Sequence, residues 1–365
     1  YFMNNIKKIG LTALAGSLVS LGSAVAGEMS VSGAINTTLK FGKPNVGNNT
    51  SRTIGTDRDV AFKGSGELDN GTTFSMNTIL DDTYAVSSST TTITTPSMGS
   101  FTMGTSTGSA SYAYDEEVPQ AYEQVSDGKQ TMSNLVGNFM DSNHVMYTLP
   151  ALEFMGAGIQ GHLGYALQAT DVGAGDGGQA AHSDSFGKGY EAGVTISYDA
   201  LKIGIYGAER ENTTPNAATG QQITDEFNGV WYAKYSMGPV SIGYSESYMD
   251  GGVTQALSSE TVDTAKAERT AGGIFTGEQM SIAFNVNDNL SISYTTSDET
   301  YDTQENALTA VTTDDDVTET IDALQVAYSM GGMSIKAYNM EVSNPDQDDN
   351  ADDQSVTEIA LGFAF

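Results

Sequence analysis

The segment MSIAFNVNDNLSISY, residues Met280–Tyr294, alternates apolar and polar side chains on both sides of a short polar turn. Period-two alternation places the apolar residues on one face of a β-strand and the polar residues on the other. The turn, Asn287-Asp288-Asn289, contains residue types that commonly reverse the chain. The segment is therefore predicted to be a β-hairpin with one apolar and one polar face.

The same alternation recurs along the chain from Met29 to Phe365, with further clean hairpins across Asp199-Ala200, Gly238-Pro239 and Gly331-Gly332. Sixteen strands are predicted, near residues 29–41, 60–68, 74–80, 89–95, 101–103, 145–149, 159–165, 190–198, 201–205, 231–235, 240–244, 280–286, 290–294, 324–330, 333–337 and 359–365. Short turns alternate with long polar connections. This asymmetry is typical of an outer-membrane barrel with tight periplasmic turns and long external loops.

The apolar residues are dispersed, although they make up 39% of the chain, and its mean hydropathy is −0.25. A soluble domain of this length would usually show continuous apolar strands for a buried core. Most charged residues of the alternating segments fall on the polar parity, namely Lys40, Lys63, Glu191, Lys202, Lys234, Lys336 and Glu358. The pattern predicts an all-β fold, a 16-stranded antiparallel transmembrane β-barrel with lipid outside and a water-filled lumen inside.

The formal net charge of −31 excludes attraction to nucleic acid and favours cations as partners. The acidic runs Asp314–Asp316 and Asp346–Asp353 offer oxygen ligands that suit Ca²⁺ or Mg²⁺. Neither run has the glycine and closing Glu of a helix-flanked calcium loop, so ordered sites and loosely held ions both stay open. No cofactor is expected beyond these ions. The chain has no cysteine, so disulfides cannot contribute to its stability.

The first residues have the pattern of a secretory signal peptide. The basic pair Lys7-Lys8 precedes an apolar stretch, Ile9–Leu21, which ends in the small residues Ala24-Val25-Ala26. The stretch is shorter than the ~20 residues that a spanning helix requires. We expect residues 1–26 to direct export through the periplasm, with Tyr1-Phe2 upstream of the start, and residues 27–365 to form the outer-membrane barrel.

Four segments together resemble the Gram-negative general porin family, over essentially the whole chain after residue 26. They are Val31-Ser-Gly-Ala-Ile-Asn-Thr-Thr-Leu39, Gly64-Ser-Gly-Glu-Leu-Asp-Asn-Gly71, Asn143-His-Val-Met-Tyr-Thr-Leu-Pro150 and Ala360-Leu-Gly-Phe-Ala-Phe365. The resemblance implies a homotrimer among outer-membrane lipid and lipopolysaccharide. It also implies that Phe363 and Phe365 belong to the signal that the barrel assembly machinery recognises.

The resemblance further implies that a third external loop folds into the lumen and forms a constriction. Ser106–Ser142 occupies that place, and its acids Asp115, Glu116, Glu117 and Glu123, followed by Asp127, would face cations on the barrel wall. The matching wall residues are Lys40, Lys63 and His144, where the family usually has several arginines. The expected pore is therefore dominated by acids and prefers cations, with passive diffusion of small hydrophilic solutes and ions as its function.

Two alternatives stay open from the sequence, a substrate-selective outer-membrane channel and a secreted all-β adhesin or structural protein. Enzymatic activity is not predicted, because no nucleophile, base and orienting group are clustered. Gly156, Gly158 and Gly161 match a dinucleotide fingerprint only in spacing, since they run into an alternating strand. His144 and His162 have the lumen parity, and together with His182 they lack the spacing of a zinc site.

Overall fold

The computed structural model describes residues 27–43, 51–105, 109–115, 117–125, 136–140, 144–169, 186–212, 224–251, 274–302 and 316–365. The predicted signal peptide, residues 1–26, lies outside this part of the chain. Strands dominate the described residues, joined by a few short 3₁₀ turns. None of the helices in the described ranges is long and apolar enough to cross a membrane.

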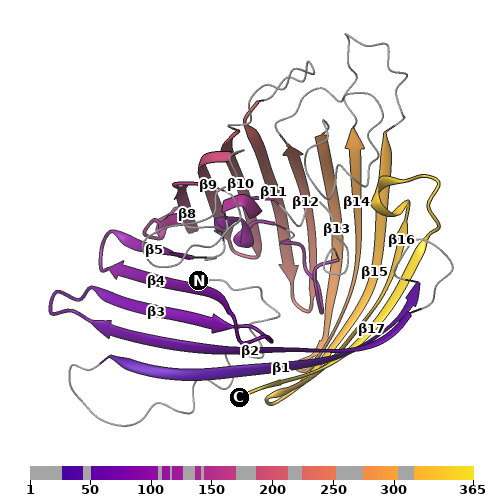
Figure 1. The fold of residues 1–365 in the computed structure, drawn as a ribbon, viewed down its shortest axis with the longest axis horizontal. Helices are drawn as coiled ribbons and strands as arrows, with labels where there is room; N and C mark the ends of the chain where they lie inside the picture. The colour runs from indigo at the N-terminus through magenta and orange to yellow at the C-terminus, as the bar shows by residue number, and fades with distance from the viewer. Residues whose placement is uncertain are drawn as a thin grey trace.

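The strands form one sheet in which every pairing is antiparallel (Figure 1). Their bounds are β1 Glu28–Lys43, β2 Ser51–Glu67, β3 Thr73–Leu80, β4 Val86–Thr95, β5 Gly99–Thr105, β6 His144–Thr148, β7 Leu152–Phe154, β8 Ala157–Ala166, β9 Phe186–Tyr198, β10 Leu201–Asn212, β11 Glu226–Met237, β12 Val240–Asp250, β13 Ile274–Asn287, β14 Leu290–Asp302, β15 Val317–Met330, β16 Met333–Ser343 and β17 Gln354–Ala364. The sheet closes on itself, because β1 pairs with β2 along one edge and with β17 along the other.

Two of the seventeen segments share one place in the barrel. Both β6 and β7 pair with β8, so they are the two parts of a single interrupted strand. Pro150 lies in the interruption and has no N–H to donate to a neighbouring strand. The barrel therefore has the predicted 16 strands, and the sixth of them continues after the interruption to Phe154, beyond the predicted residues 145–149.

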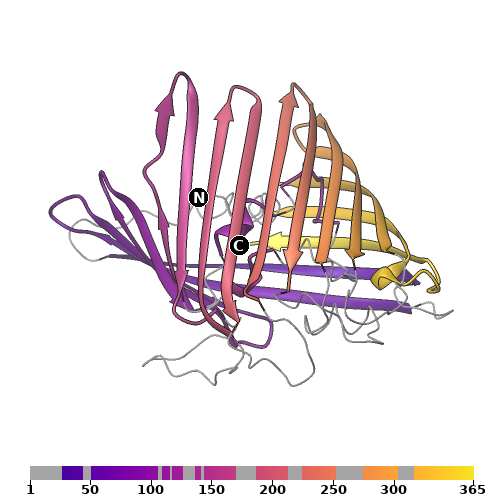
Figure 2. The same cartoon turned by 90° about the horizontal axis from the view of Figure 1, so that it is seen from above.

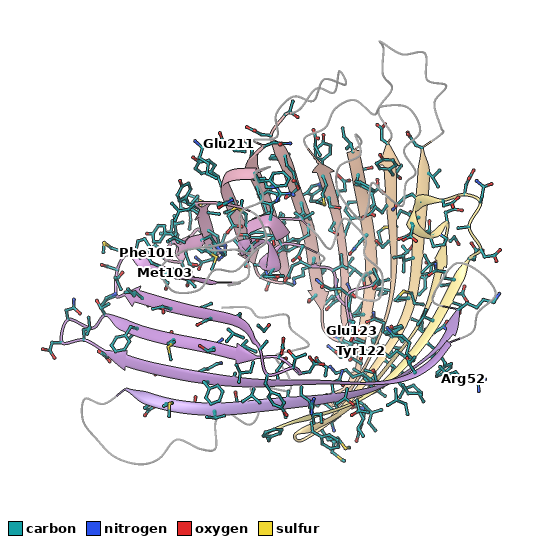
Figure 3. All side chains as sticks on the ribbon, in the orientation of Figure 1. Arg52, Phe101, Met103, Tyr122, Glu123 and Glu211 are labelled. Carbon is teal, nitrogen blue, oxygen red and sulfur yellow. The ribbon has the colours of Figure 1, made fainter. Side chains whose placement is uncertain are left out.

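The strand register confirms the predicted parity of the two faces. Large apolar side chains that stay exposed project outward, among them Phe101 and Met103 on β5 (Figure 3). Nearer the loop ends of β12 to β16, the outward-facing residues are carboxylates instead. They are Glu246, Glu278, Asp298, Asp322 and Glu341. The Trp231 Nε1 and Tyr244 Oη atoms donate to Glu246, at 2.9 and 2.6 Å. An apolar band thus ends in an aromatic and acidic border on the loop side.

The wall of the barrel is uneven in height. The strands from β3 to β8 have at most 10 residues, whereas those from β9 to β17 have 11 to 14 (Figure 2). The β3–β4 connection, residues 81–85, is also short, unlike the long loop that the alternating pattern indicated. Arg58, outward on β2, donates to the Asp82 carbonyl at 3.1 Å and lies over the Tyr84 ring.

Candidate pore constriction

The third connection on the loop side, residues 106–143, is called here the lumen loop. Its described parts, which include the 3₁₀ turns η1 (Ala110–Ala113) and η3 (Asn138–Met140), lie inside the barrel (Figure 1). They pack on inward-facing residues of β8 to β17 and bury two apolar clusters there. This confirms that the loop folds into the lumen. Its packing against one side of the wall leaves the inner faces of β1 to β5 outside both clusters.

The first part of the lumen loop is anchored on Glu191 of β9, a buried wall carboxylate. The Ala110 N–H donates to Glu191 Oε1 at 3.1 Å, and the Tyr206 hydroxyl donates to Oε2 at 2.7 Å. His144 Nε2 lies 3.9 Å from the same carboxylate. A buried carboxylate requires such donors, because its charge has lost the solvation by water. Glu191 therefore fixes where the loop enters the lumen.

Tyr114 packs against the wall at Gly193, which has no side chain. A Cβ atom on Gly193 would collide with the Tyr114 ring, so glycine is required for this close approach. The ring stacks on Tyr206 with centroids 5.4 Å apart, and its hydroxyl hydrogen-bonds His162 Nδ1 at 2.7 Å. Burial raises the pKa of the Tyr114 hydroxyl well above its ordinary value. The tyrosine thus stays neutral within this contact.

The middle of the lumen loop is anchored by charge. Glu117 Oε2 lies 3.5 Å from Lys202 Nζ of β10 and also accepts a hydrogen bond from Lys234 Nζ of β11. Both lysines lie over the face of Tyr232, at 5.4 and 5.6 Å from the ring centroid. Pro119 follows in the chain and accepts a hydrogen bond from Ser281 through its carbonyl.

The next part of the lumen loop reaches the last strands of the barrel. The Tyr122 N–H donates to Gln325 Oε1 at 2.8 Å, and Gln325 Nε2 donates to the Glu123 carbonyl at 2.6 Å. The Tyr122 hydroxyl donates to Glu358 Oε1 at 2.7 Å, and Lys40 Nζ lies 3.1 Å from Glu358 Oε2. Tyr122 and Glu123 are seen on the inner side of the barrel in Figure 3.

The predicted constriction residues do not simply form two opposed groups, with loop acids on one side of the pore and wall cations on the other. Among the described residues, Glu117 binds Lys202 and Lys234, whereas Lys40 and His144 contact the wall carboxylates Glu358 and Glu191. Lys63 lies on the inward parity of β2, and Asp115, which is part of the lumen loop, is buried. Glu116 and Asp127 lie outside the described residues. The alternation of the sequence placed Lys202 and Lys234 on the lumen face, but no feature of the sequence indicated that they contact Glu117.

Most of the inward-facing side chains of β3 to β6 are neutral hydroxyls and amides, beside Ile79, His144 and Met146 on the same face. The hydroxyl and amide residues are Thr73, Ser75, Asn77, Ser88, Thr90, Thr92, Thr94, Ser100, Thr102 and Thr148. Thr92 and Thr102 hydrogen-bond at 2.9 Å across β4 and β5, and Thr94 and Ser100 do so at 2.8 Å. This surface corresponds to the threonine-rich fourth strand of the sequence, and it adds no charge to the lumen.

The connection between β16 and β17 also folds inward, which the sequence did not indicate. Its turn η4, Pro345–Gln347, places the Gln347 amide 2.9 Å from Glu299 and the Asp346 N–H 2.5 Å from Glu319. Within the described ranges no group of three or more His, Cys, Asp or Glu side chains is arranged to hold a metal ion. Asp314 and Asp315 lie outside these ranges, so divalent-cation binding by the acidic runs stays a prediction.

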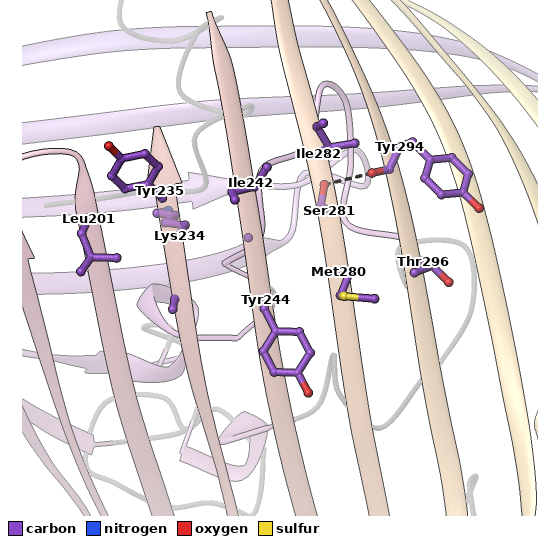
Figure 4. A pocket seen from close by; sticks show the side chains of 12 residues that line it. Leu201, Lys234, Tyr235, Ile242, Tyr244, Met280, Ser281, Ile282, Tyr294 and Thr296 are labelled. Carbon is purple, nitrogen blue, oxygen red and sulfur yellow. Dashed lines mark hydrogen bonds between the residues drawn. The ribbon is translucent and has the colours of Figure 1, made fainter. Parts of the chain in front are cut away.

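One hollow of about 540 Å³ lies on the barrel surface among β10 to β14 (Figure 4). The side chains that line it are mostly outward-facing and apolar, such as Ile242, Met280 and Ile282. It therefore belongs to the lipid-facing surface.

A closed barrel with an apolar exterior, a polar lumen and an inward-folded loop defines a channel protein of the outer membrane. The chain belongs to the Gram-negative porin family, whose model matches residues 10–225. No curated protein matches the chain.

Solved porin-like structures share this fold at low sequence identity. OmpF of Salmonella typhi, in complex with daunomycin, is 11% identical, with 93% of this chain and 98% of that chain covered and a TM-score of 0.64. OmpT of Vibrio cholerae is 13% identical over 95% and 100% of the two chains, with a TM-score of 0.62. The outer membrane channel DcaP of Acinetobacter baumannii is 10% identical over 95% and 100%, with a TM-score of 0.60.

Proposed function

We propose that the protein is a diffusion porin that passes small hydrophilic solutes and prefers cations. This proposal rests on the charge of the inner wall, where acidic residues outnumber basic residues among the described strand positions. The acids are Glu28, Asp57, Asp59, Glu67, Glu153, Glu191, Glu226, Glu299, Glu319 and Glu358; the bases are Lys40, Lys63, Lys202, Lys234, Lys336 and Arg210. A lumen of one dominant sign concentrates counter-ions of the other.

Most of the wall cations lie within ion-pair distance of a carboxylate. Lys40 is paired with Glu358, Lys202 and Lys234 with Glu117, and Arg210 with Glu226 at 2.5 Å. Charges that are neutralised at close range contribute little to the potential along the pore. Each pair also uses one carboxylate, so the negative excess of the wall remains, with one local positive excess where Lys202 and Lys234 share Glu117. Passive diffusion needs neither a cofactor nor covalent chemistry.

Liposome swelling tests the diffusion function directly. Vesicles that contain the refolded chain from Gly27 to Phe365 are placed in isotonic solutions of neutral sugars of increasing size. Swelling that falls smoothly with sugar size is expected of a water-filled pore. Vesicles that swell in one sugar only would indicate a substrate-selective channel instead, and vesicles that never swell would contradict an open pore.

We propose in addition that three copies assemble into a homotrimer in the outer membrane, surrounded by lipid and lipopolysaccharide. An in-vitro folded OmpT of Vibrio cholerae is described in a trimer form, with 14% identity over 93% of this chain and a TM-score of 0.59. Cross-linking of the refolded chain in detergent tests the stoichiometry. A ladder that ends at three copies is expected, and a single monomer band would contradict the proposal.

Export and assembly complete the proposal. Residues 1–26 would direct secretion through the periplasm, and Phe363 and Phe365 would be recognised by the barrel assembly machinery. Phe365 pairs with Gly33 through hydrogen bonds of 2.8 and 3.0 Å, so it lies at the seam where the barrel closes. Deletion of Phe365 is expected to reduce the amount of folded barrel in the outer membrane.

A further inference from the structure

Lys202 and Lys234 are direct cross-strand neighbours on the lumen face of β10 and β11. Like charges in this position repel each other. Glu117 of the lumen loop lies between them and binds both through Oε2. One carboxylate therefore binds two ammonium groups. This set of three residues is named the lysine cradle.

The lysine cradle differs from two other ion pairs of the lumen wall. Lys40–Glu358 and Arg210–Glu226 each join one cation with one carboxylate on neighbouring strands. In the cradle the carboxylate comes from a loop, and one positive charge remains in excess. A net positive point in an otherwise acidic lumen attracts anions locally.

The cradle is accessible from the lumen. The side chains of Lys202, Lys234 and Glu117 keep 24%, 23% and 13% of their exposure, in contrast to the buried anchor at Glu191. The Tyr232 ring lies beneath both ammonium groups and restricts where they can move. Its hydroxyl is buried and has no hydrogen-bond partner among the described residues.

We propose that the lysine cradle is a binding site for small carboxylate solutes, with Glu117 as a built-in competitor. A solute carboxylate has the same charge and geometry as the Glu117 side chain that the two lysines bind. It would take the place of Glu117 or share the cradle by using the excess charge. Binding beside the lumen loop then obstructs the current. The proposal rests on the diffusion function and deepens it, because it adds a class of solute that an acid-rich pore would otherwise repel.

Single-channel recording with succinate as the probe tests this site. The refolded chain is measured in potassium chloride with increasing succinate, beside the variants Lys234→Met, Glu117→Gln and Lys188→Met. Lys188 is an exposed residue of β9 and serves as the matched control for the loss of one positive charge. Heat-dependent gel mobility shows that each variant forms the barrel.

The variants are expected to change the block in opposite directions. Glu117→Gln removes the competitor, so the half-blocking succinate concentration should fall about tenfold. Lys234→Met should abolish the block, and Lys188→Met should leave it unchanged. An unchanged or weaker block in Glu117→Gln, or an equal loss in Lys188→Met, overturns the proposal.

Calorimetric titration of the refolded protein with succinate separates the cradle from the channel. It needs no ionic current, so binding that Lys234→Met abolishes supports the cradle even if the diffusion function fails. Heat changes that are the same in the wild type and Lys234→Met contradict the cradle, whatever the current shows.

Discussion

Lys40 on the first strand and Glu358 on the last strand form an ion pair of 3.1 Å directly across the seam of the barrel. The Tyr122 hydroxyl of the lumen loop donates to the same carboxylate at 2.7 Å. Closure of the barrel and docking of the loop thus share one anchor. Lys40 was expected to face loop acids across the pore, and instead it stabilises the carboxylate that holds the loop.

Glu358→Gln should weaken both functions of this anchor. The substitution keeps the shape of the side chain but removes the charge that Lys40 and Tyr122 bind, at about 1.5–3 kcal/mol for hydrogen bonds to a charged group. Unfolding in urea should therefore show a loss of stability of that order. Glu341→Gln, an outward position on β16, is the control. Equal stability of the two variants would contradict a shared anchor.

Gly243→Val should displace the lumen loop. A Cβ atom on Gly243 would collide with Pro119, and the backbone of Val118 lies close behind it. The loop must move away from the wall, so single-channel conductance should change and become noisier. Gly158→Val is the control, because a Cβ there meets only the Ser197 carbonyl, at 4.0 Å. A conductance like that of the control would show that the loop does not dock at Gly243.

Gly33→Val should impair closure of the barrel. A Cβ atom on Gly33 would lie 2.8 Å from the ring of Phe365, whose backbone pairs with Gly33. The valine should slow refolding, as measured by heat-dependent gel mobility. Gly64→Val on β2 is the matched control, since nothing lies within 4 Å of that Cβ position. Identical refolding of both variants would exclude a role for this contact.

Tyr122 should resist ionisation in the folded protein. Burial, followed by the neighbouring Glu123 and Glu358, raises the pKa of its hydroxyl well above the ordinary value. The neutral form is the one that the fold favours. Its contribution to docking is therefore complete below the ordinary pKa of about 10 and is lost only as pH rises through the higher folded value. Tyrosinate absorbance up to about pH 11 should be the same in the wild type and in Tyr122→Phe, and a smaller signal in the variant would contradict this.

The strands and their two faces could be predicted from the sequence because a barrel wall repeats every two residues. Segments such as Met280–Tyr294 show that repeat directly, and the register confirms it. The contacts of Glu117 could not be predicted, since a loop has no such period. Its partners Lys202 and Lys234 are 85 or more positions away and adjoin it only through the path of the loop. The place of the loop in the lumen was predicted only through the resemblance to porins.

The zero-current potential of the refolded chain in a planar bilayer under a potassium chloride gradient tests the acid-dominated lumen most directly. A potential of the sign and size expected for potassium permeation is predicted, because Lys40, Lys202, Lys234 and Arg210 are held by carboxylates. A potential that favours chloride would contradict the cation preference and show that the wall lysines, rather than the acids, set the charge of the pore.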